Sequence, residues 1–373
     1  MQNLISALSI GFGVGINAVI SDHLGAGEID KADAAATRGM ACSVIHGVVS
    51  MIVCITVMPR FLRLFTDSEQ VAEMGTQYAS IAFAFSVIIM VGLAFEKIYQ
   101  AMGRMQVTMT ALRFGCVTNI GRVPRFIFGV GPFPQLGMRG AALATILSQL
   151  LSAIWILRFL TSDKTILKLR RSSMRLSARR VRKIVGLGLS GFTMAITNCT
   201  VQIMCNATLQ VYGGDLYVGV MTVINSIREI ATLPVTGVTH SAQPVLGFNY
   251  GAKEYGRVKK AIVFTSFIAI LYTTGIWLIV DGFPAFFIRI FNQDAELIAA
   301  GIPAIRLYFF GFFMMSLQFS GQSIFVGLGE SKKAIFFSIF RKVIIVVPLT
   351  ILLPGMFGMG TNGVFDAEPI SQF

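Results

Sequence analysis

Several long stretches of the sequence contain no Asp, Glu, Lys or Arg. Among them are residues 39–59, 184–214, 261–280 and 307–329. An apolar helix of about 20 residues crosses the hydrocarbon core of a bilayer, where the backbone has to satisfy its own hydrogen bonds. Only 13% of all residues are charged, about half the share found in soluble domains. The sequence therefore predicts an all-α polytopic membrane protein surrounded by the lipid bilayer.

The hydrophobic pattern predicts ten spans and an eleventh, partial one that ends at Phe373. The ten are residues 1–22, 37–62, 76–100, 106–130, 139–160, 184–212, 216–248, 258–290, 298–327 and 333–356. A strongly basic segment, residues 162–183, separates the fifth span from the sixth. Such a segment favours the cytoplasmic side of a membrane and contact with anionic lipid. The net charge of +13 is thus explained without nucleic acid as a partner.

A repeat divides the sequence into two related halves. GAGE at 25–28 matches GAKE at 251–254, which lies 226 residues later. Three more matches follow in the same order at nearly the same offset, pairing PRFLRLFTDSE with PAFFIRIFNQDAE, AMGRM with GLGES, and GMRGAALA with GTNGVFDA. Repeated bundles of this kind are typical of transporters.

The repeat predicts two pseudo-symmetric helical bundles. They are an N-terminal lobe over 1–161 and a C-terminal lobe over 184–373, joined by 162–183 as a basic cytoplasmic linker. Aligning the halves leaves residues 184–226 without a first-half partner and ends the second half early. We therefore expect a twelve-helix fold that lacks its first helix and most of its last.

Several segments resemble the MATE (multidrug and toxic compound extrusion) family, and most closely its bacterial branch. They are SIREIATLPVTGVTHSAQPVLGFNYGAKEYGRVKKAI, GFFMMSLQFSGQSIFVGLGES and RKVIIVVPLTILLPGMFGMGTNGVFDAEPIS, with VISDHLGAGE, FEKIYQAMGR and GAALATILSQ in the first half. The resemblance implies a monomeric, multi-pass protein of the bacterial plasma (inner) membrane. It also implies export of amphipathic organic cations by alternating access, in exchange for Na⁺ or H⁺ and without another cofactor.

One helix departs from the family pattern. Relatives usually read TNIILDPILIFG there, whereas this chain reads TNIGRVPRFIFG. Asn119 is kept, but Val123 replaces the intramembrane Asp, and Arg122 and Arg125 are new. Many relatives also carry an acidic residue where Asn198 stands. The departures affect groups that bind the coupling cation in relatives.

Charged and polar side chains inside spans are the candidate substrate- or ion-binding residues. Arg228 and Glu229 interrupt a long uncharged region, and an intramembrane charge tends to face a cavity or a partner. Neighbouring residues on a helix diverge by about 100°, so the two cannot face the same partner. Glu229 is expected to attract a cation, or else both side chains extend to the nearby interface. The full candidate set is Glu229, Arg228, Asn225, Gln318, Gln322, Tyr308, Asn198, Gln202, Asn119 and Gln149.

The polar stripes in two spans have two interpretations. Gln318 and Gln322 lie on one helix face near aromatic rings such as Tyr308, which suits cation–π binding in a cavity. Asn198 and Gln202 form a second stripe. Amide side chains in spans also hydrogen-bond neighbouring helices, and for the second stripe helix packing is the preferred interpretation.

Other features favour structure over catalysis. GFGVGIN at 11–17 resembles a dinucleotide loop, but it follows no strand, so its glycines favour close helix packing. Glu96 and Lys97 are expected to form an interfacial pair. The five cysteines are expected to be small buried hydrophobic residues. With no Ser-His-Asp set, catalytic carboxylate pair or Walker loop in the sequence, a transporter rather than an enzyme is predicted.

Two alternatives to a drug exporter stay open. A lipid-linked oligosaccharide flippase of the same superfamily would place basic residues in its cavity rather than in cytoplasmic loops. A truncated chain that no longer transports would keep the fold without the activity.

Overall fold

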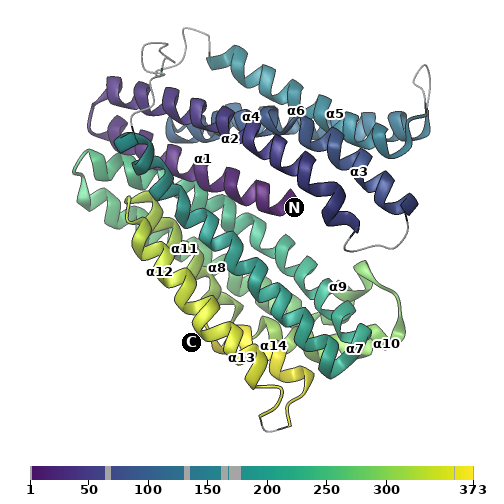
Figure 1. Ribbon diagram of the computed structural model, residues 1–373. Helices are drawn as coiled ribbons and strands as arrows, with labels where there is room; N and C mark the ends of the chain where they lie inside the picture. The colour runs from purple at the N-terminus through teal and green to yellow at the C-terminus, as the bar shows by residue number, and fades with distance from the viewer. Residues whose placement is uncertain are drawn as a thin grey trace. The chain divides into compact units, whose positions relative to one another are not determined.

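A computed structural model describes residues 2–63, 69–129, 135–160, 167, 178–356 and 358–372. The chain forms two compact units, Met1–Gly188 (unit 1) and Leu189–Phe373 (unit 2). Within the described ranges the regular elements are helices, and none is a strand (Figure 1). Of the predicted linker 162–183, everything before residue 178 except Leu167 lies outside the described residues.

In its described residues, unit 1 forms six helices and the first residues of a seventh. They are α1 Gln2–Gly25, α2 Ile29–Arg63, α3 Glu69–Ala84, α4 Ser86–Ala101, α5 Met105–Phe128 and α6 Gly137–Leu160. The core of the unit forms where α1, α2 and α4 meet, around Ile16, Ile98 and Tyr99.

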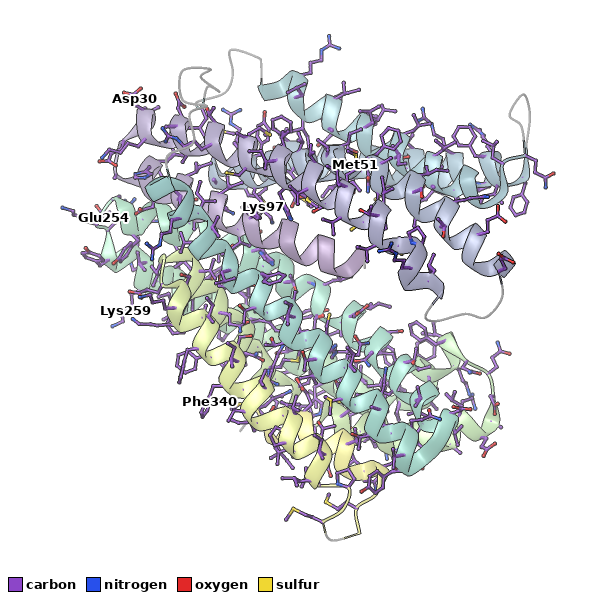
Figure 2. All side chains as sticks on the ribbon, viewed as in Figure 1. Asp30, Met51, Lys97, Glu254, Lys259 and Phe340 are labelled. Carbon is purple, nitrogen blue, oxygen red and sulfur yellow. The ribbon has the colours of Figure 1, made fainter. Side chains whose placement is uncertain are left out.

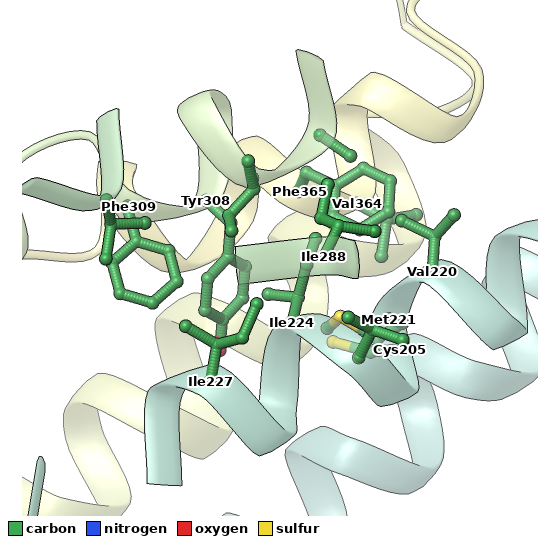
Figure 3. Close-up of a cluster of buried hydrophobic side chains, with 14 of the residues drawn as sticks. Cys205, Val220, Met221, Ile224, Ile227, Ile288, Tyr308, Phe309, Val364 and Phe365 are labelled. Atoms are coloured by element: carbon green, nitrogen blue, oxygen red, sulfur yellow. The ribbon is translucent and has the colours of Figure 1, made fainter. Parts of the chain in front are cut away.

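Unit 2 contains most of α7 and all later helices. They are α7 Ala178–Gly251, α8 Tyr255–Gly282, α9 Pro284–Phe291, α10 Ala295–Phe309, α11 Phe312–Gly327, α12 Ser331–Ile339, the π-helix η2 Phe340–Val346, α13 Val347–Leu352 and α14 Thr361–Ile370. Figure 3 shows its core, where Ile224 and Ile227 of α7 pack near Tyr308 and Phe309 of α10.

The described parts of the ten predicted spans are mostly helical, although 76–100, 258–290 and 298–327 each cover two helices with a break between them. Among the described residues, five helices are long and apolar enough to cross a membrane, and two further pairs qualify if each is taken as one bent span. The predicted spans 184–212 and 216–248 both lie in α7, which breaks at Gly214 with φ 64° and ψ −163°. A side chain with a Cβ is strained at this φ, so Gly214 allows the chain to turn between the two arms.

The repeated turn has the same backbone in both halves. Gly27 has φ 74°, and Lys253, its counterpart, has φ 61° despite its side chain. The hydrogen bond from Glu28 N to His23 O measures 2.9 Å, and so does that from Glu254 N to Asn249 O. Figure 2 labels Asp30 beside the first turn and Glu254 in the second. The repeat read from the sequence is therefore a repeat of local structure.

Two further features recur at the same offset. Gly103 and Gly329 have φ values of 72° and 80° and end α4 and α11 with matching hydrogen bonds. The break between α3 and α4 bends the chain by 49°, and so does the break between α10 and α11. The two halves thus share turns and bends as well as helix order.

The glycines of α1 allow close contact with the start of α7. A Cβ on Gly188 would lie 2.5 Å from the carbonyl oxygen of Gly11, and one on Gly15 would collide with the carbonyl of Ile184. Gly13 lies against the Lys97 side chain. The prediction that GFGVGIN serves helix packing is confirmed.

The prediction that all cysteines are buried is wrong for two of the five. Cys42, Cys54 and Cys205 are buried, but Cys116 and Cys199 are exposed. Cys116 borders a cavity between α4, α5 and α6. Exposed and core positions of an apolar membrane helix are similar in composition, so hydrophobicity alone does not separate them.

The contact between α1 and α7 yields a first prediction. Gly188→Ala should destabilise unit 1 by about 1–3 kcal/mol, since a methyl group added to a tight contact forces the backbone apart. Gly186→Ala, two residues earlier, is the matched control because no atom lies within 4 Å of its added Cβ. Thermal unfolding in detergent should show a lower Tm for the first variant alone; equal Tm values would contradict the packing role.

The first repeated turn yields a pH-dependent prediction. Glu28 accepts a 2.6 Å hydrogen bond from Lys31 and lies 2.8 Å from Nδ1 of His23. Lys31 first, and then His23, lower the pKa of Glu28 below its ordinary value of 4.5. A depressed carboxyl pKa stabilises the fold above that ordinary value, and the benefit is lost as the pH falls through the folded-state pKa.

The Tm difference between the wild type and Glu28→Gln should therefore be largest above pH 4.5 and shrink in acid. Glu254→Gln is the counterpart in the second half, where the described residues supply no ion pair. Its Tm difference should vary less with pH. A Glu28→Gln difference that stays constant down to acid pH would contradict the role of the ion pairs.

Candidate binding cavities

A mostly apolar cavity of about 290 Å³ lies within unit 1, between α4, α5 and α6. Ser152 of α6 holds one wall in place, because its hydroxyl donates a 2.9 Å hydrogen bond to the carbonyl of Ala111 on α5. Sites for drug-sized molecules begin at about 300 Å³ and are mostly apolar with a few polar groups. The cavity therefore has the size and character of a small-molecule site.

The polar groups of the unit 1 cavity include several acceptors, beside hydroxyl and amide groups that also donate. Glu96 lines it, together with the predicted candidates Asn119 and Gln149. Buried oxygen atoms of three lining residues, Thr108, Asn119 and Gln149, find no hydrogen-bond partner among the described residues. A carboxylate and such oxygens favour a ligand that carries positive charge or N–H donors.

Glu96 belongs to a short polar network on α4. Its carboxylate accepts a 2.7 Å hydrogen bond from Gln100, and Lys97 donates one of 2.9 Å to the same amide. Lys97 is only 7% exposed; Figure 2 labels it. The predicted pair is present, because Lys97 Nζ lies 3.6 Å from Glu96. Its predicted interfacial position is wrong for Lys97, whose side chain is buried against Gly13.

A second, smaller cavity of about 20 Å³ lies within unit 2. Side chains from both arms of α7, from α10, η2 and α14 line it. They include five predicted candidates, Asn198, Gln202, Asn225, Arg228 and Tyr308, together with Lys342 and Glu368. Because residues before and after Gly214 meet here, the two arms of α7 pack side by side.

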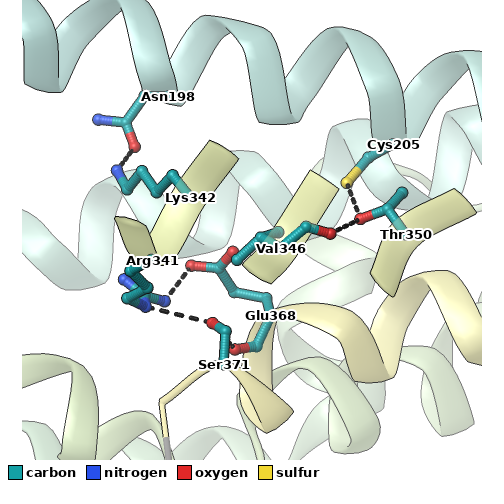
Figure 4. Close-up of polar contacts among 8 residues, drawn as sticks. All are labelled: Asn198, Cys205, Arg341, Lys342, Val346, Thr350, Glu368 and Ser371. Atoms are coloured by element: carbon teal, nitrogen blue, oxygen red, sulfur yellow. Dashed lines mark hydrogen bonds and ion pairs between the residues drawn. The ribbon is translucent and has the colours of Figure 1, made fainter. Parts of the chain in front are cut away.

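Charged groups concentrate around the unit 2 cavity (Figure 4). Arg341 donates a 2.7 Å hydrogen bond to Glu368, and the two side chains are 11% and 8% exposed. Arg341 Nε also contacts the hydroxyl of Ser371 at 3.2 Å. Lys342 donates to the side-chain oxygen of Asn198. Buried charges of this kind need partners, and those at membrane depth are often functional.

The π-helix η2 presents Arg341 and Lys342 at this position. Pro348 follows it and has no N–H for the carbonyl of Ile344, and a proline ring also crowds that carbonyl. A wider turn relieves this conflict, and the helix is in π geometry over Phe340–Val346. π-turns within helices occur frequently at functional sites.

The structure does not bring every candidate into a cavity. Glu229 is exposed while Arg228, one residue earlier, lines the unit 2 cavity, as the divergence of neighbouring helix positions requires. Gln318 and Gln322 of α11 line neither cavity. Gln322 is 4% exposed, and both of its amide atoms lack a partner among the described residues.

Other polar groups of α11 bind neighbouring helices. Ser320 lies 2.8 Å from the hydroxyl of Ser266 on α8, and Ser323 donates to the carbonyl of Thr239 on α7. These serines of α11 thus contribute to helix packing, whereas the role of Gln318 and Gln322 stays a prediction.

Sequence reasoning missed Glu96, Arg341, Lys342 and Glu368 as site residues. Glu96 was assigned to an interface because it lies near the end of its predicted span. Arg341 and Lys342 lie inside the predicted span 333–356 but were not weighed as site residues, and Glu368 lies in the terminal segment beyond the last full span. A signal was present, since all four are charged residues within or next to apolar runs.

Comparisons with known proteins agree with this architecture. The sequence pattern of the MatE family matches residues 1–122 and 190–352. Multidrug export protein MepA of Staphylococcus saprophyticus is 20% identical over 357 residues, which cover 93% of this chain and 76% of MepA. Probable multidrug resistance protein YoeA of Bacillus subtilis is 23% identical over 296 residues, covering 78% of this chain and 62% of YoeA.

Two solved structures share the fold. A crystal structure of MATE in the straight conformation superposes with a TM-score of 0.93 at 23% identity, covering 100% of this chain and 82% of the other. A MOP superfamily transporter from Pyrococcus furiosus, described as having a binding pocket of reverse polarity, gives the same TM-score, identity and coverage. The predicted all-α polytopic membrane fold is confirmed.

The buried ion pair yields a third prediction. Glu368→Gln should lower the free energy of unfolding by about 3 kcal/mol, because it leaves the Arg341 charge buried without its counter-ion. Asp281→Asn is the matched control. It breaks the 3.9 Å contact between Asp281, which is 47% exposed, and Arg306, which is 56% exposed. The loss of this exposed contact should change the free energy of unfolding by less than about 1 kcal/mol. Denaturant unfolding in detergent measures the free energy of unfolding of both variants. Comparable losses would show that the buried pair stabilises the fold no more than an exposed one.

Proposed function

The chain belongs to the MATE family, and we propose that it exports amphipathic organic cations by antiport with Na⁺ or H⁺. The two units would expose the binding site alternately to the two sides of the bacterial plasma membrane. Support comes from the match to the MatE family and from relatives named as multidrug export proteins. A secondary transporter needs an ion gradient and no further cofactor.

The unit 1 cavity is the observation that carries this proposal. Its volume of about 290 Å³ suits a small drug, and its surface is mostly apolar. Glu96 supplies a carboxylate, which also has Lys97 Nζ at 3.6 Å, and Asn119 and Gln149 supply unpaired oxygens. An aromatic cation would place its ring system on the apolar wall and its charge near Glu96.

An oligosaccharide flippase is the second candidate, and one observation favours it. Arg228 and Lys342 line the unit 2 cavity, so basic residues are not confined to loops. A lipid-linked sugar is held through its diphosphate, however, and a cavity of about 20 Å³ is close to the size of one water molecule. The larger, acceptor-lined cavity of unit 1 therefore makes cation export the better supported function.

Ethidium transport by purified protein in proteoliposomes tests the proposal. Gradients of Na⁺ and of H⁺ are imposed separately, so that the coupling ion is identified by the gradient that drives ethidium uphill. Uphill movement with either gradient supports antiport. Ethidium movement that follows neither gradient would contradict it, and no movement at all would favour the alternative that the chain does not transport.

The Glu96 carboxylate yields the fourth prediction. Glu96→Gln keeps the size of the side chain and should raise the apparent KM for ethidium at least about tenfold, because a charge-assisted contact contributes about 1.5–3 kcal/mol. Glu73→Gln, on an exposed position of α3, is the matched control and should leave the KM unchanged. Equal KM values for both variants would remove Glu96 from the binding site.

A further inference from the structure

The charges around the unit 2 cavity do not balance. Glu368 is the single carboxylate among the lining residues, while Arg228 and Lys342 are both cations. Glu368 is already paired with Arg341 at 2.7 Å. Arg228, Arg341 and Lys342 thus share one carboxylate, which leaves an excess of positive charge around the cavity.

Deprotonation of these side chains cannot remove all of the excess positive charge around the cavity. An arginine side chain stays protonated in proteins, so Arg228 and Arg341 are both charged and face one carboxylate. Deprotonation of Lys342 would still leave Arg228 uncompensated. Glu229, its neighbour in sequence, is exposed and does not line the cavity.

Unsatisfied donors accompany the excess charge. The Nε atom of Arg228 is buried and has no hydrogen-bond partner among the described residues. Lys342 is 7% exposed and donates to Asn198, which occupies one of its three N–H groups. A buried charge without a counter-ion destabilises the fold unless an opposite charge enters.

The shape of the cavity limits what can enter. Its volume of about 20 Å³ exceeds the roughly 10–15 Å³ that one water molecule requires. A diphosphate or an aromatic carboxylate is too large for this space. Asn198 and Gln202 at its rim are exposed, whereas Tyr308, Lys342 and Glu368 are buried, so the cavity is accessible from the side of the first arm of α7.

We infer that the unit 2 cavity binds a small monovalent anion of the chloride type, held by Arg228 and Lys342. The anion offsets the excess positive charge of the lobe. It accepts hydrogen bonds from N–H groups of Arg228 on α7 and Lys342 on η2. This site is separate from the cation cavity in unit 1 and does not depend on the proposed export activity.

Thermal unfolding of the purified protein in detergent tests the inference. Sodium gluconate is replaced stepwise by sodium chloride at constant ionic strength, and the series is repeated with choline salts to separate chloride from Na⁺. The Tm should rise with chloride and saturate as expected for one site in both series. Arg228→Gln and Lys342→Met should each weaken the apparent chloride affinity roughly 10- to 100-fold, the effect of losing a hydrogen bond from a charged donor.

Arg306→Gln is the matched control, because it removes an exposed cation from α10 and should keep the chloride response of the wild type. If the cavity variants do not fold, crystals of the wild type grown in bromide give a second test. An anomalous peak between Arg228 and Lys342 is expected. A wild-type Tm that does not respond to chloride, a response that survives in both cavity variants, or bromide crystals without a peak in this cavity would overturn the inference.

Discussion

The structure depends on the absence of water in the bilayer core, which obliges each backbone group to pair within its own helix. The chain changes direction where special residues allow it, as at Gly214 in α7 and at the repeated turns around Gly27 and Lys253. Hydrocarbon also removes most of the hydrophobic force between helices, so packing relies on small residues and polar contacts. The glycine contact of α1 with α7 and the Ser266–Ser320 pair are the local consequences.

The absence of water also gives the bilayer core a low dielectric constant, which limits the positions where a charged side chain is stable. Glu368, Arg341 and Lys342 are kept inside unit 2 because each has a polar partner there. The two cavities differ in sign: unit 1 offers a carboxylate and unpaired oxygens, and unit 2 offers guanidinium and ammonium groups. One protein of the MATE family thus contains two separate environments, the first suited to a cation and the second to a small anion.

The internal repeat kept the backbone while the side chains diverged. Gln322 stands 226 residues after Glu96, on the helix that repeats α4, and is buried without a hydrogen-bond partner among the described residues. Lys97 is likewise replaced by Ser323, which binds the carbonyl of Thr239. A shared scaffold therefore presents a charged network in one half and a neutral helix contact in the other.

The sequence by itself determined the helical spans, the repeated turn and the polar residues that lie at membrane depth, because these follow from local hydrophobicity and local turn chemistry. It did not determine which polar residues meet. Glu368 and Arg341 are 27 positions apart, and Lys342 and Asn198 are 144 apart. Whether such residues touch depends on the rotation of each helix and on its neighbours. Only the tertiary structure placed Arg228 in the cavity and Glu229 outside it, since a rotation of that helix by about 100° would have exchanged them.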